Sequence, residues 1–218
     1  MHKTVHGWVF PQHELHLPVW MDHPKNRLYL NGRLAYQGKK QVAAMKYCTR
    51  HRVAIDVGAH VGLWSYNMAH EFATVFAFEP VAEHRECFEK NMVGVGQHVH
   101  IMAMALGAEL GAVSIATEAG SSGNSTVSGP GAIPMHTLDG LLLDNVDFIK
   151  VDCEGYEENV LRGGAETIKR DKPVIIVEQK RDMAAKMGLK TLGAVDFLKT
   201  LGYKVTKEIS GDYIMVPQ

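Results

Sequence analysis

The 218-residue sequence is poor in cysteine, in long apolar runs and in net charge, and each shortage excludes a class of protein. Its three cysteines, Cys48, Cys87 and Cys153, are far apart, which excludes a disulfide scaffold and favours reduced thiols in a cytoplasmic protein. No apolar run approaches the ~18 residues that span a bilayer, and the first residues lack a signal-peptide core, so we expect no membrane partner. Lysine and arginine number 23 against 24 aspartate and glutamate residues, a balance that disfavours a nucleic-acid partner.

What the sequence does contain is the pattern of an α/β protein. Its composition, 46% hydrophobic and 22% charged residues, is that of a globular domain. From residue 53 onward, short apolar runs alternate with amphipathic stretches, which predicts a parallel sheet flanked by helices. The predicted strands are 53–57, 74–78, 99–103, 148–151 and 174–177. The predicted helices cover about 63–70, 81–91 and 157–169, and Gly163-Gly164 indicates close packing or a break in the last one.

Three further segments depart from this alternation. Residues 203–209 and 213–216 flank Ser210-Gly211-Asp212, which predicts a β-hairpin and therefore an antiparallel last strand. Residues 1–45 hold five of the twelve histidines without clean periodicity, so we expect an N-terminal cap of strands and turns before a main domain over 46–218. Residues 107–136 contain six glycines and five serines, which is typical of a mobile lid or a disordered tip.

The segment from Asp56 to Gly62 is typical of a ligand-binding turn, because a strand ends there and passes through glycines into a helix. Gly58 allows a tight turn and close approach of a ligand, and a helix start at Gly62 would offer unpaired N–H groups to an anion. Glu79 ends the next strand, where a carboxylate can accept hydrogen bonds from both hydroxyls of a ribose. These residues together predict a site for a nucleoside-bearing cofactor.

The spacing of the glycines bears on which cofactor this is. A dinucleotide site has the pattern G-x-G-x-x-G, whereas this sequence has G-x-x-x-G with His60 inside it. Asp56 would repel a pyrophosphate but attract the ammonium group of a methionine, so S-adenosylmethionine (SAM) fits better than NAD. The simpler alternative is that the glycines only form a β–α turn and that Asp56 caps a backbone group.

A second group of acidic residues follows the fourth predicted strand. Ligands of open α/β sheets lie beyond the carboxyl ends of the strands, near the point where strand order reverses. Asp152 and Glu154 should therefore lie above the same crevice as Asp56, where they could orient a substrate hydroxyl and remove its proton. The alternative is that they form the acidic first turn of the next helix, which is the role we expect for Glu157 and Glu158.

Several stretches resemble one known family in order and spacing. They are IDVGAHVG, VFAFEPVAE, MHTLDGLL, FIKVDCEGYEENVLRGGAETI and VIIVE, and together they cover roughly residues 50–180. The chain resembles the FkbM-type SAM-dependent methyltransferases. The resemblance implies a Rossmann-like class I methyltransferase fold, with helices on both faces of a mostly parallel seven-stranded sheet and an antiparallel C-terminal strand. It also implies O-methylation of a hydroxyl, often on a sugar or another small metabolite.

The same resemblance assigns roles to individual residues. It implies that Asp56, Gly58 and Gly62 contact the methionyl part of SAM and that Glu79 contacts the ribose, with Ala59, His60 and Pro80 beside them. Met104 and Ala105 would flank the adenine, Asp152 and Glu154 match the acidic catalytic pair, and Glu178 lies towards the substrate. His60 stands where the family commonly has asparagine, and Cys153 where it commonly has valine.

The hypothesis is therefore a cytoplasmic SAM-dependent methyltransferase acting on a hydroxyl of a small molecule. The alternatives are a nicotinamide-dependent oxidoreductase, a non-catalytic nucleoside-binding module and an RNA methyltransferase. The basic stretch Lys39, Lys40, Lys46, Arg50 and Arg52 keeps the RNA alternative open, although a solvated helix face is its default interpretation. We expect no metal site, since His13, His16, Asp22 and His23 have the character of surface residues.

Overall fold

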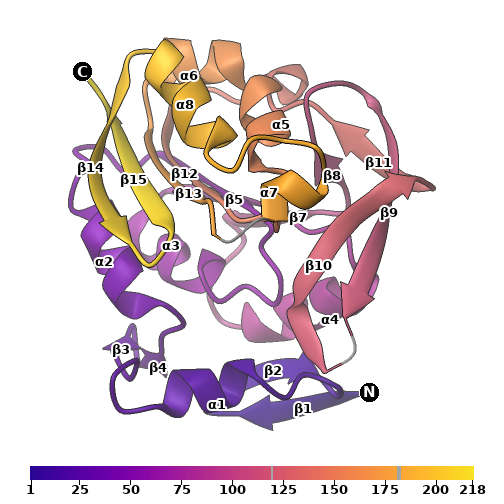
Figure 1. Cartoon of the computed structure of the whole chain (residues 1–218). Coiled ribbons are helices and arrows are strands. Elements are labelled where there is room, and N and C mark those ends of the chain that lie inside the picture. The colour runs from indigo at the N-terminus through magenta and orange to yellow at the C-terminus, as the bar shows by residue number, and fades with distance from the viewer. Residues whose placement is uncertain (119, 181–182) are drawn as a thin grey trace.

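The computed structural model describes residues 1–118, 120–180 and 183–218 and is built around one large sheet (Figure 1). Its seven strands have the order β14-β15-β13-β12-β5-β6-β7. They are β5 (Val53–Val57), β6 (Thr74–Phe78), β7 (Val99–Met102), β12 (Val146–Val151), β13 (Val174–Glu178), β14 (Tyr203–Ile209) and β15 (Asp212–Pro217). The pairs from β7 to β13 are parallel, and β15 is antiparallel to both β13 and β14. The predicted mostly parallel sheet with an antiparallel last strand is confirmed.

The central strands are apolar because helices cover both faces of the sheet (Figure 1). Three helices pack on the face that carries Ala54, Phe148 and Ile176: α2 (Gly38–Met45), α3 (Ser65–Glu71) and α4 (Ala82–Asn91). Three others pack on the face that carries Ile55 and Ile149: α5 (Glu157–Arg162), α6 (Ala165–Asp171) and α8 (Gly193–Thr200). No helix within the described ranges is long and apolar enough to cross a membrane.

The predicted helix over 157–169 is two helices, because the Gly163-Gly164 pair separates α5 from α6. A β-carbon on Gly163 would lie 2.0 Å from the backbone oxygen of Gly107, and one on Gly164 would lie 2.8 Å from Leu138. Both glycines are therefore required by close packing as well as by the break. The Gly163 backbone thereby touches the start of the segment that follows β7.

That segment forms a second sheet of four strands in the order β10-β9-β11-β8 (Figure 1). The strands are β8 (Ala105–Leu106), β9 (Gly111–Glu118), β10 (Ser121–Pro130) and β11 (Ile133–His136), followed by the short 3-10 helix η1 (Asp139–Leu141). The glycine- and serine-rich composition had indicated no strands here. Val113, Ile115 and Val127 supply the apolar contacts that pair the hairpin β9–β10, and these few residues are a weak signal within the run.

The N-terminal segment packs against α3 and α4 on one side of the molecule (Figure 1). It consists of the hairpin β1 (His2–Val5) and β2 (Trp8–Pro11), α1 (Leu17–Asp22), and the short hairpin β3 (Tyr29–Leu30) and β4 (Arg33–Leu34). Trp8 and Phe10 are fully buried there, and the Asn91 side chain exchanges hydrogen bonds with the backbone of Val9. The short helix α7 (Met183–Lys186) lies between β13 and α8 in the chain.

Candidate functional site

Two adjoining cavities lie at the carboxyl ends of β5, β6, β12 and β13, where the order of the strands reverses. The apolar cavity has about 600 Å³ of space, partly open to solvent, and is bordered by Phe78, Pro80, Met104, Ala105, Ile115 and Tyr156. The acidic cavity has about 590 Å³ and is bordered by Tyr36, Trp64, Lys150, Asp152, Glu154 and Glu178. Both cavities also share Gly58, His60, Gly123, Asp152 and Glu154. This is the position at which open α/β sheets bind ligands.

Most of the residues predicted from the sequence come together here. Glu79, Pro80, Met104 and Ala105 border the apolar cavity, and Ala59 and Glu178 border the acidic one. Four of the predicted residues border both cavities, namely Gly58, His60, Asp152 and Glu154. Asp56 and Gly62 border neither.

The turn after β5 is held by its glycines in a way that differs from the expectation. Gly58 has φ +74°, and a β-carbon there would lie 1.9 Å from the backbone oxygen of Asp152, so its missing side chain lets two loops of the protein meet. Gly62 has φ +89°, and a β-carbon there would run into Met92 and Phe88 of the α4 region. The expected unpaired N–H at Gly62 is wrong, because this group donates to the oxygen of Ala59 at 2.9 Å and α3 begins only at Ser65.

His60 joins this turn to two other segments. Its φ of +52° is a left-handed conformation that asparagine adopts more easily than most residues. Its backbone N–H donates to Oε2 of Glu79 at 2.8 Å, and its Nε2 lies 2.7 Å from the Ser122 hydroxyl. Since that hydroxyl donates to Glu14 at 2.6 Å, it must accept from Nε2–H of His60. Burial lowers the pKa of His60 well below its usual 6.5, helped by His84, and keeps the ring neutral.

Glu79 is buried at the rim of the apolar cavity, directly after β6. Its Oε2 accepts the N–H of His60, while its Oε1 accepts the N–H of Val81 at 2.9 Å and lies 3.2 Å from Nδ1 of His84. These bonds fix the orientation of the carboxylate. A carboxylate has about four acceptor sites, so capacity remains for a donor that enters the cavity.

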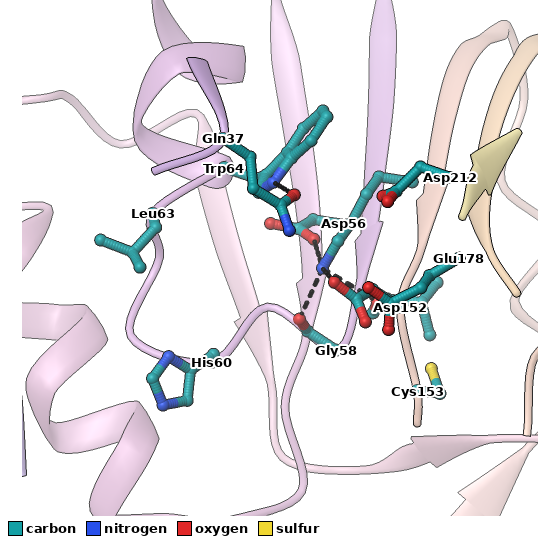
Figure 2. Close-up of polar contacts among 12 residues, drawn as sticks. Gln37, Asp56, Gly58, His60, Leu63, Trp64, Asp152, Cys153, Glu178 and Asp212 are labelled. Atoms are coloured by element: carbon teal, nitrogen blue, oxygen red, sulfur yellow. Dashed lines mark hydrogen bonds and ion pairs between the residues drawn. The ribbon is translucent and has the colours of Figure 1, made fainter. Parts of the chain in front are cut away.

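Asp56 lies behind the acidic cavity and is fully buried (Figure 2). Its Oδ2 accepts a hydrogen bond from the Ser65 hydroxyl at 2.6 Å, and its Oδ1 lies 3.2 Å from Nζ of Lys150. Burial raises the pKa of Asp56, and the contacts with Lys150 and Ser65 act against that shift. The carboxylate is thus compensated by an ammonium of the protein itself, which differs from the expectation that it faces the ammonium of a ligand.

Lys150 is the residue that connects the site, and the sequence analysis did not assign it. Its Nζ donates to the backbone oxygen of Gly58 at 2.8 Å and lies 3.8 Å from Oδ2 of Asp152. Burial disfavours its charge, but Asp56 and Asp152 outweigh burial and raise the pKa of Lys150. A lysine inside the apolar run FIKV was the available signal, because such a strand position is buried and a charge there needs a partner.

Three carboxylates line the acidic cavity beside this lysine. Oxygens of Asp152, Glu154 and Glu178 lie within 4.8 Å of one another, a spacing at which one cation or one hydroxylated ligand can contact all three. Glu178 also pairs with Lys180. The loop that carries Asp152 and Glu154 is held by Glu157, whose Oε1 accepts the N–H groups of Cys153 and Gly155 at 3.0 and 2.9 Å.

Three residues of the basic stretch before β5 form ion pairs. Lys40 was expected on a solvated helix face, but it is buried and pairs with Asp212 of β15. The reason is that α2 packs on the sheet next to β13 and β15, which turns this lysine inward. Arg50 and Arg52 both lie against Asp147, at 3.4 and 2.6 Å.

Comparison with known proteins agrees with this arrangement. The profile of the methyltransferase FkbM domain matches residues 56–205, which is more than half of the chain. The chain belongs to the FkbM methyltransferase family. No curated protein sequence matches it.

Solved methyltransferases share its fold at low sequence identity. A methyltransferase FkbM from Methylobacillus flagellatus is 15% identical with a TM-score of 0.52, over 76% of this chain and 44% of that one, so the chain spans less than half of that relative. A precorrin-6y C5,15-methyltransferase from Geobacter metallireducens is 14% identical with a TM-score of 0.50, over 88% and 93%. A Streptococcus mutans structure in complex with SAH is 8% identical with a TM-score of 0.51, over 82% and 94%.

The matched FkbM domain does not contain the whole site. Tyr36 and Glu14 precede residue 56, yet Tyr36 borders the acidic cavity and Glu14 holds Ser122 at the rim of the apolar one. The sequence carried no signal for the contact between Glu14 and Ser122, which lie more than a hundred residues apart. His84 could have been predicted as a residue of the site, because a histidine on the buried face of an amphipathic helix needs a polar partner.

The half-buried His60 leads to a prediction about the pH dependence of stability in this FkbM protein. Its folded pKa lies well below 6.5, so the stability it contributes is present above pH 6.5 and is lost as the pH falls and the unfolded chain binds the proton. Between about pH 7.5 and about pH 5.5, wild type should lose about 1 kcal/mol more unfolding free energy than His60→Asn. Urea unfolding followed by circular dichroism measures this difference.

The exposed His100 provides the matched control, and His100→Asn should follow wild type. If wild type and His60→Asn lose equal amounts of unfolding free energy as the pH falls, the neutral imidazole of His60 is contradicted.

Proposed function

We propose that the protein is a SAM-dependent O-methyltransferase whose acceptor is a hydroxyl of a small metabolite or sugar. The observation that carries the proposal is the pair of joined cavities, one apolar with a carboxylate at its rim and one acidic, which share Asp152 and Glu154. A reaction between two ligands requires them to meet at one point, and the shared residues mark that point. The methyltransferase family and fold support the same activity.

The apolar cavity suits SAM better than a dinucleotide. Glu79 can accept ribose hydroxyls, and the apolar side chains that follow β7, Met104 and Ala105, offer a surface for the adenine. Among the described residues, the charged side chains that border this cavity are the carboxylates of Glu79, Asp152 and Glu154. They would repel the diphosphate of NAD and attract a sulfonium or ammonium. We therefore assign the methionyl ammonium to the Asp152 and Glu154 side, with Asp56 acting through Lys150.

The acidic cavity suits a hydroxylated acceptor. Carboxylates are acceptors of hydrogen bonds, so Asp152, Glu154 and Glu178 favour a ligand rich in hydroxyl donors. Bound SAM would supply an electrophilic methyl group at the junction of the cavities, and its carbon–sulfur bond would break to leave SAH. Asp152 or Glu154 accepts the proton that the acceptor hydroxyl loses as the new carbon–oxygen bond forms, and most of the acceleration comes from alignment of the reacting atoms.

The charges elsewhere count against RNA as the acceptor. A phosphate backbone is bound by free lysine and arginine side chains. Three of the five basic residues, Lys40, Arg50 and Arg52, instead contact Asp212 and Asp147, which reduces the charge that this stretch offers to a phosphate backbone.

The segment 107–136 is proposed as the lid of this site. Ser122, Gly123 and Ser125 of β10 border the apolar cavity. The buried carboxylate of Glu14 accepts both the N–H and the hydroxyl of Ser122, at 2.7 and 2.6 Å, and so fastens β10 to the N-terminal segment. Release of this contact would open the cavity, and its formation would exclude water.

Replacement of Glu79 tests the cofactor side. Glu79→Gln should weaken binding of SAM and of S-adenosylhomocysteine (SAH) by about 10- to 100-fold, since hydrogen bonds to a charged acceptor contribute about 1.5–3 kcal/mol. Isothermal calorimetry with SAM, SAH and NAD measures the affinities. The exposed Glu86 gives the control Glu86→Gln. Unchanged SAM affinity in Glu79→Gln, or tight binding of NAD by wild type, would refute the assignment.

Replacement of Asp152 tests the chemistry. Asp152→Asn should reduce single-turnover rates by about 10²- to 10³-fold, the contribution typical of a general base, while SAM affinity changes less. The readout is SAH release with acceptors from a panel of hydroxylated metabolites, and the exposed Asp144 gives the control Asp144→Asn. If only Glu154→Gln reduces the single-turnover rate, Glu154 is the carboxylate that accepts the proton of the acceptor hydroxyl. Wild-type rates in both variants would show that neither carboxylate is the base.

Replacement of Glu14 tests the lid. Glu14→Gln removes the negative charge that accepts the hydrogen bonds of Ser122, so these bonds become weaker. Both the amide exchange rate in peptides of β10 and the dissociation rate of SAH should rise by about ten-fold. Hydrogen–deuterium exchange and stopped-flow fluorescence measure the two rates. The exposed Glu109 provides the control Glu109→Gln. An unchanged exchange pattern would mean that Glu14 does not hold the hairpin.

A further inference from the structure

Tyr36 is a residue of the acidic cavity that lies outside the matched FkbM domain. It follows β4 and precedes α2, and it borders the cavity together with Asp152, Glu154 and Glu178. Its ring is held edge-on against Trp20, with centroids 5.1 Å apart and an angle of 61°. Its hydroxyl group is therefore presented from a fixed position on the N-terminal segment.

The direction of the hydrogen bonds at this hydroxyl is fixed by its neighbours. The indole Nε1 of Trp64 can only donate, and it lies 3.1 Å from Oε1 of Gln37 (Figure 2). The amide nitrogen Nε2 of Gln37 is then the donor to the Tyr36 oxygen, also at 3.1 Å. The Tyr36 hydroxyl therefore accepts from Gln37, and its own hydrogen is left to donate. Within the described ranges, no hydrogen-bond acceptor takes this hydrogen.

The charges around Tyr36 keep that hydrogen in place. Burial raises the pKa of Tyr36, and Asp152, Asp212 and Glu154 raise it further, so the hydroxyl stays protonated at neutral pH. A neutral donor thus lies in the cavity that also contains the carboxylates of Asp152, Glu154 and Glu178. The hydroxyl hydrogen can therefore bind an oxygen that enters the cavity, from a ligand or from water.

We propose that Tyr36 donates a hydrogen bond to an oxygen of the methyl acceptor that neighbours the hydroxyl being methylated. The carboxylates receive hydroxyl hydrogens and Tyr36 gives one, so the cavity selects a small molecule with at least two adjacent oxygens, such as a sugar or another polyol. This inference rests on the proposed O-methyltransferase activity and deepens it. It also assigns part of the acceptor specificity to the N-terminal segment.

The test uses Tyr36→Phe, which keeps the ring contact with Trp20 and removes only the hydroxyl. Tyr66→Phe is the matched control, because the Tyr66 hydroxyl bonds the backbone of Asn31 at 3.1 Å and borders neither cavity. The full-length proteins are assayed for SAH release with SAM and a panel of monosaccharides, inositols and simple polyols. Each acceptor that wild type methylates is also tested as the deoxy analogue that lacks the neighbouring oxygen.

Tyr36→Phe should raise the KM for the acceptor by about 3- to 10-fold, the effect of one hydrogen bond, with a smaller change in kcat. SAH affinity by calorimetry should stay within about two-fold of wild type, since Tyr36 does not border the apolar cavity. With wild type, the deoxy analogue should have a KM that is higher by a similar factor. With Tyr36→Phe, the deoxy analogue should raise the KM little further, because both changes remove the same hydrogen bond.

The outcomes separate this inference from the function on which it rests. Wild type that methylates no member of the panel overturns both. Two results obtained with an active wild type would overturn the role of Tyr36 alone. One is an unchanged KM in Tyr36→Phe. The other is an increase in KM for the variant with the deoxy analogue that equals the product of the two separate increases. A loss of SAH affinity in Tyr36→Phe would also overturn it, by placing the hydroxyl on the cofactor side.

Discussion

The ammonium of Lys150 is the interaction on which the geometry of the site depends. β12 pairs with β5 so that Lys150 stands opposite Asp56, and its Nζ also reaches the oxygen of Gly58 and the carboxylate of Asp152. The buried charge of Lys150 thereby fixes Asp56 near the end of β5, the turn at Gly58, and Asp152, the first acidic residue after β12. Removal of one partner from such a buried pair is costly, about 3–5 kcal/mol, because the other charge is left without compensation.

This arrangement divides the work between two layers of charge. Asp56 and Lys150 are buried in the sheet and neutralise each other, whereas Asp152 and Glu154 stand above them and border both cavities. The lower pair positions the upper carboxylates, and of the two only Lys150 borders the acidic cavity. The pairing of Asp56 with Lys150 was not expected from the sequence. A sequence shows that a strand carries a charge, but it does not show which residue of the neighbouring strand lies opposite that charge.

The sheet could be predicted because its strands are short, apolar and separated by amphipathic helices. Strands over 53–57 and 74–78 and the terminal hairpin depend on local patterns, and those patterns agree with the packing. The position of Glu79 followed in the same way, since a polar residue at a strand end marks the edge where ligands bind. Ser122 and Glu14 could not be predicted, because each is an ordinary polar residue locally and their contact depends on how two distant hairpins fold over the sheet.

The parts that sequence patterns missed are also the parts that complete the wall of the acidic cavity. The matched FkbM domain contains the strand ends, the acidic residues and Lys150, which lie at the carboxyl edge of the sheet. The N-terminal segment adds Tyr36 and Leu17 to the wall of the acidic cavity, and β10 adds Ser121 and Asn124. Under the proposed function, reaction chemistry constrains the first set, since the same charges must meet the same reacting groups. The shape of the acceptor would then constrain the second set, and a different acceptor would require a different lining of the acidic cavity rather than a different sheet.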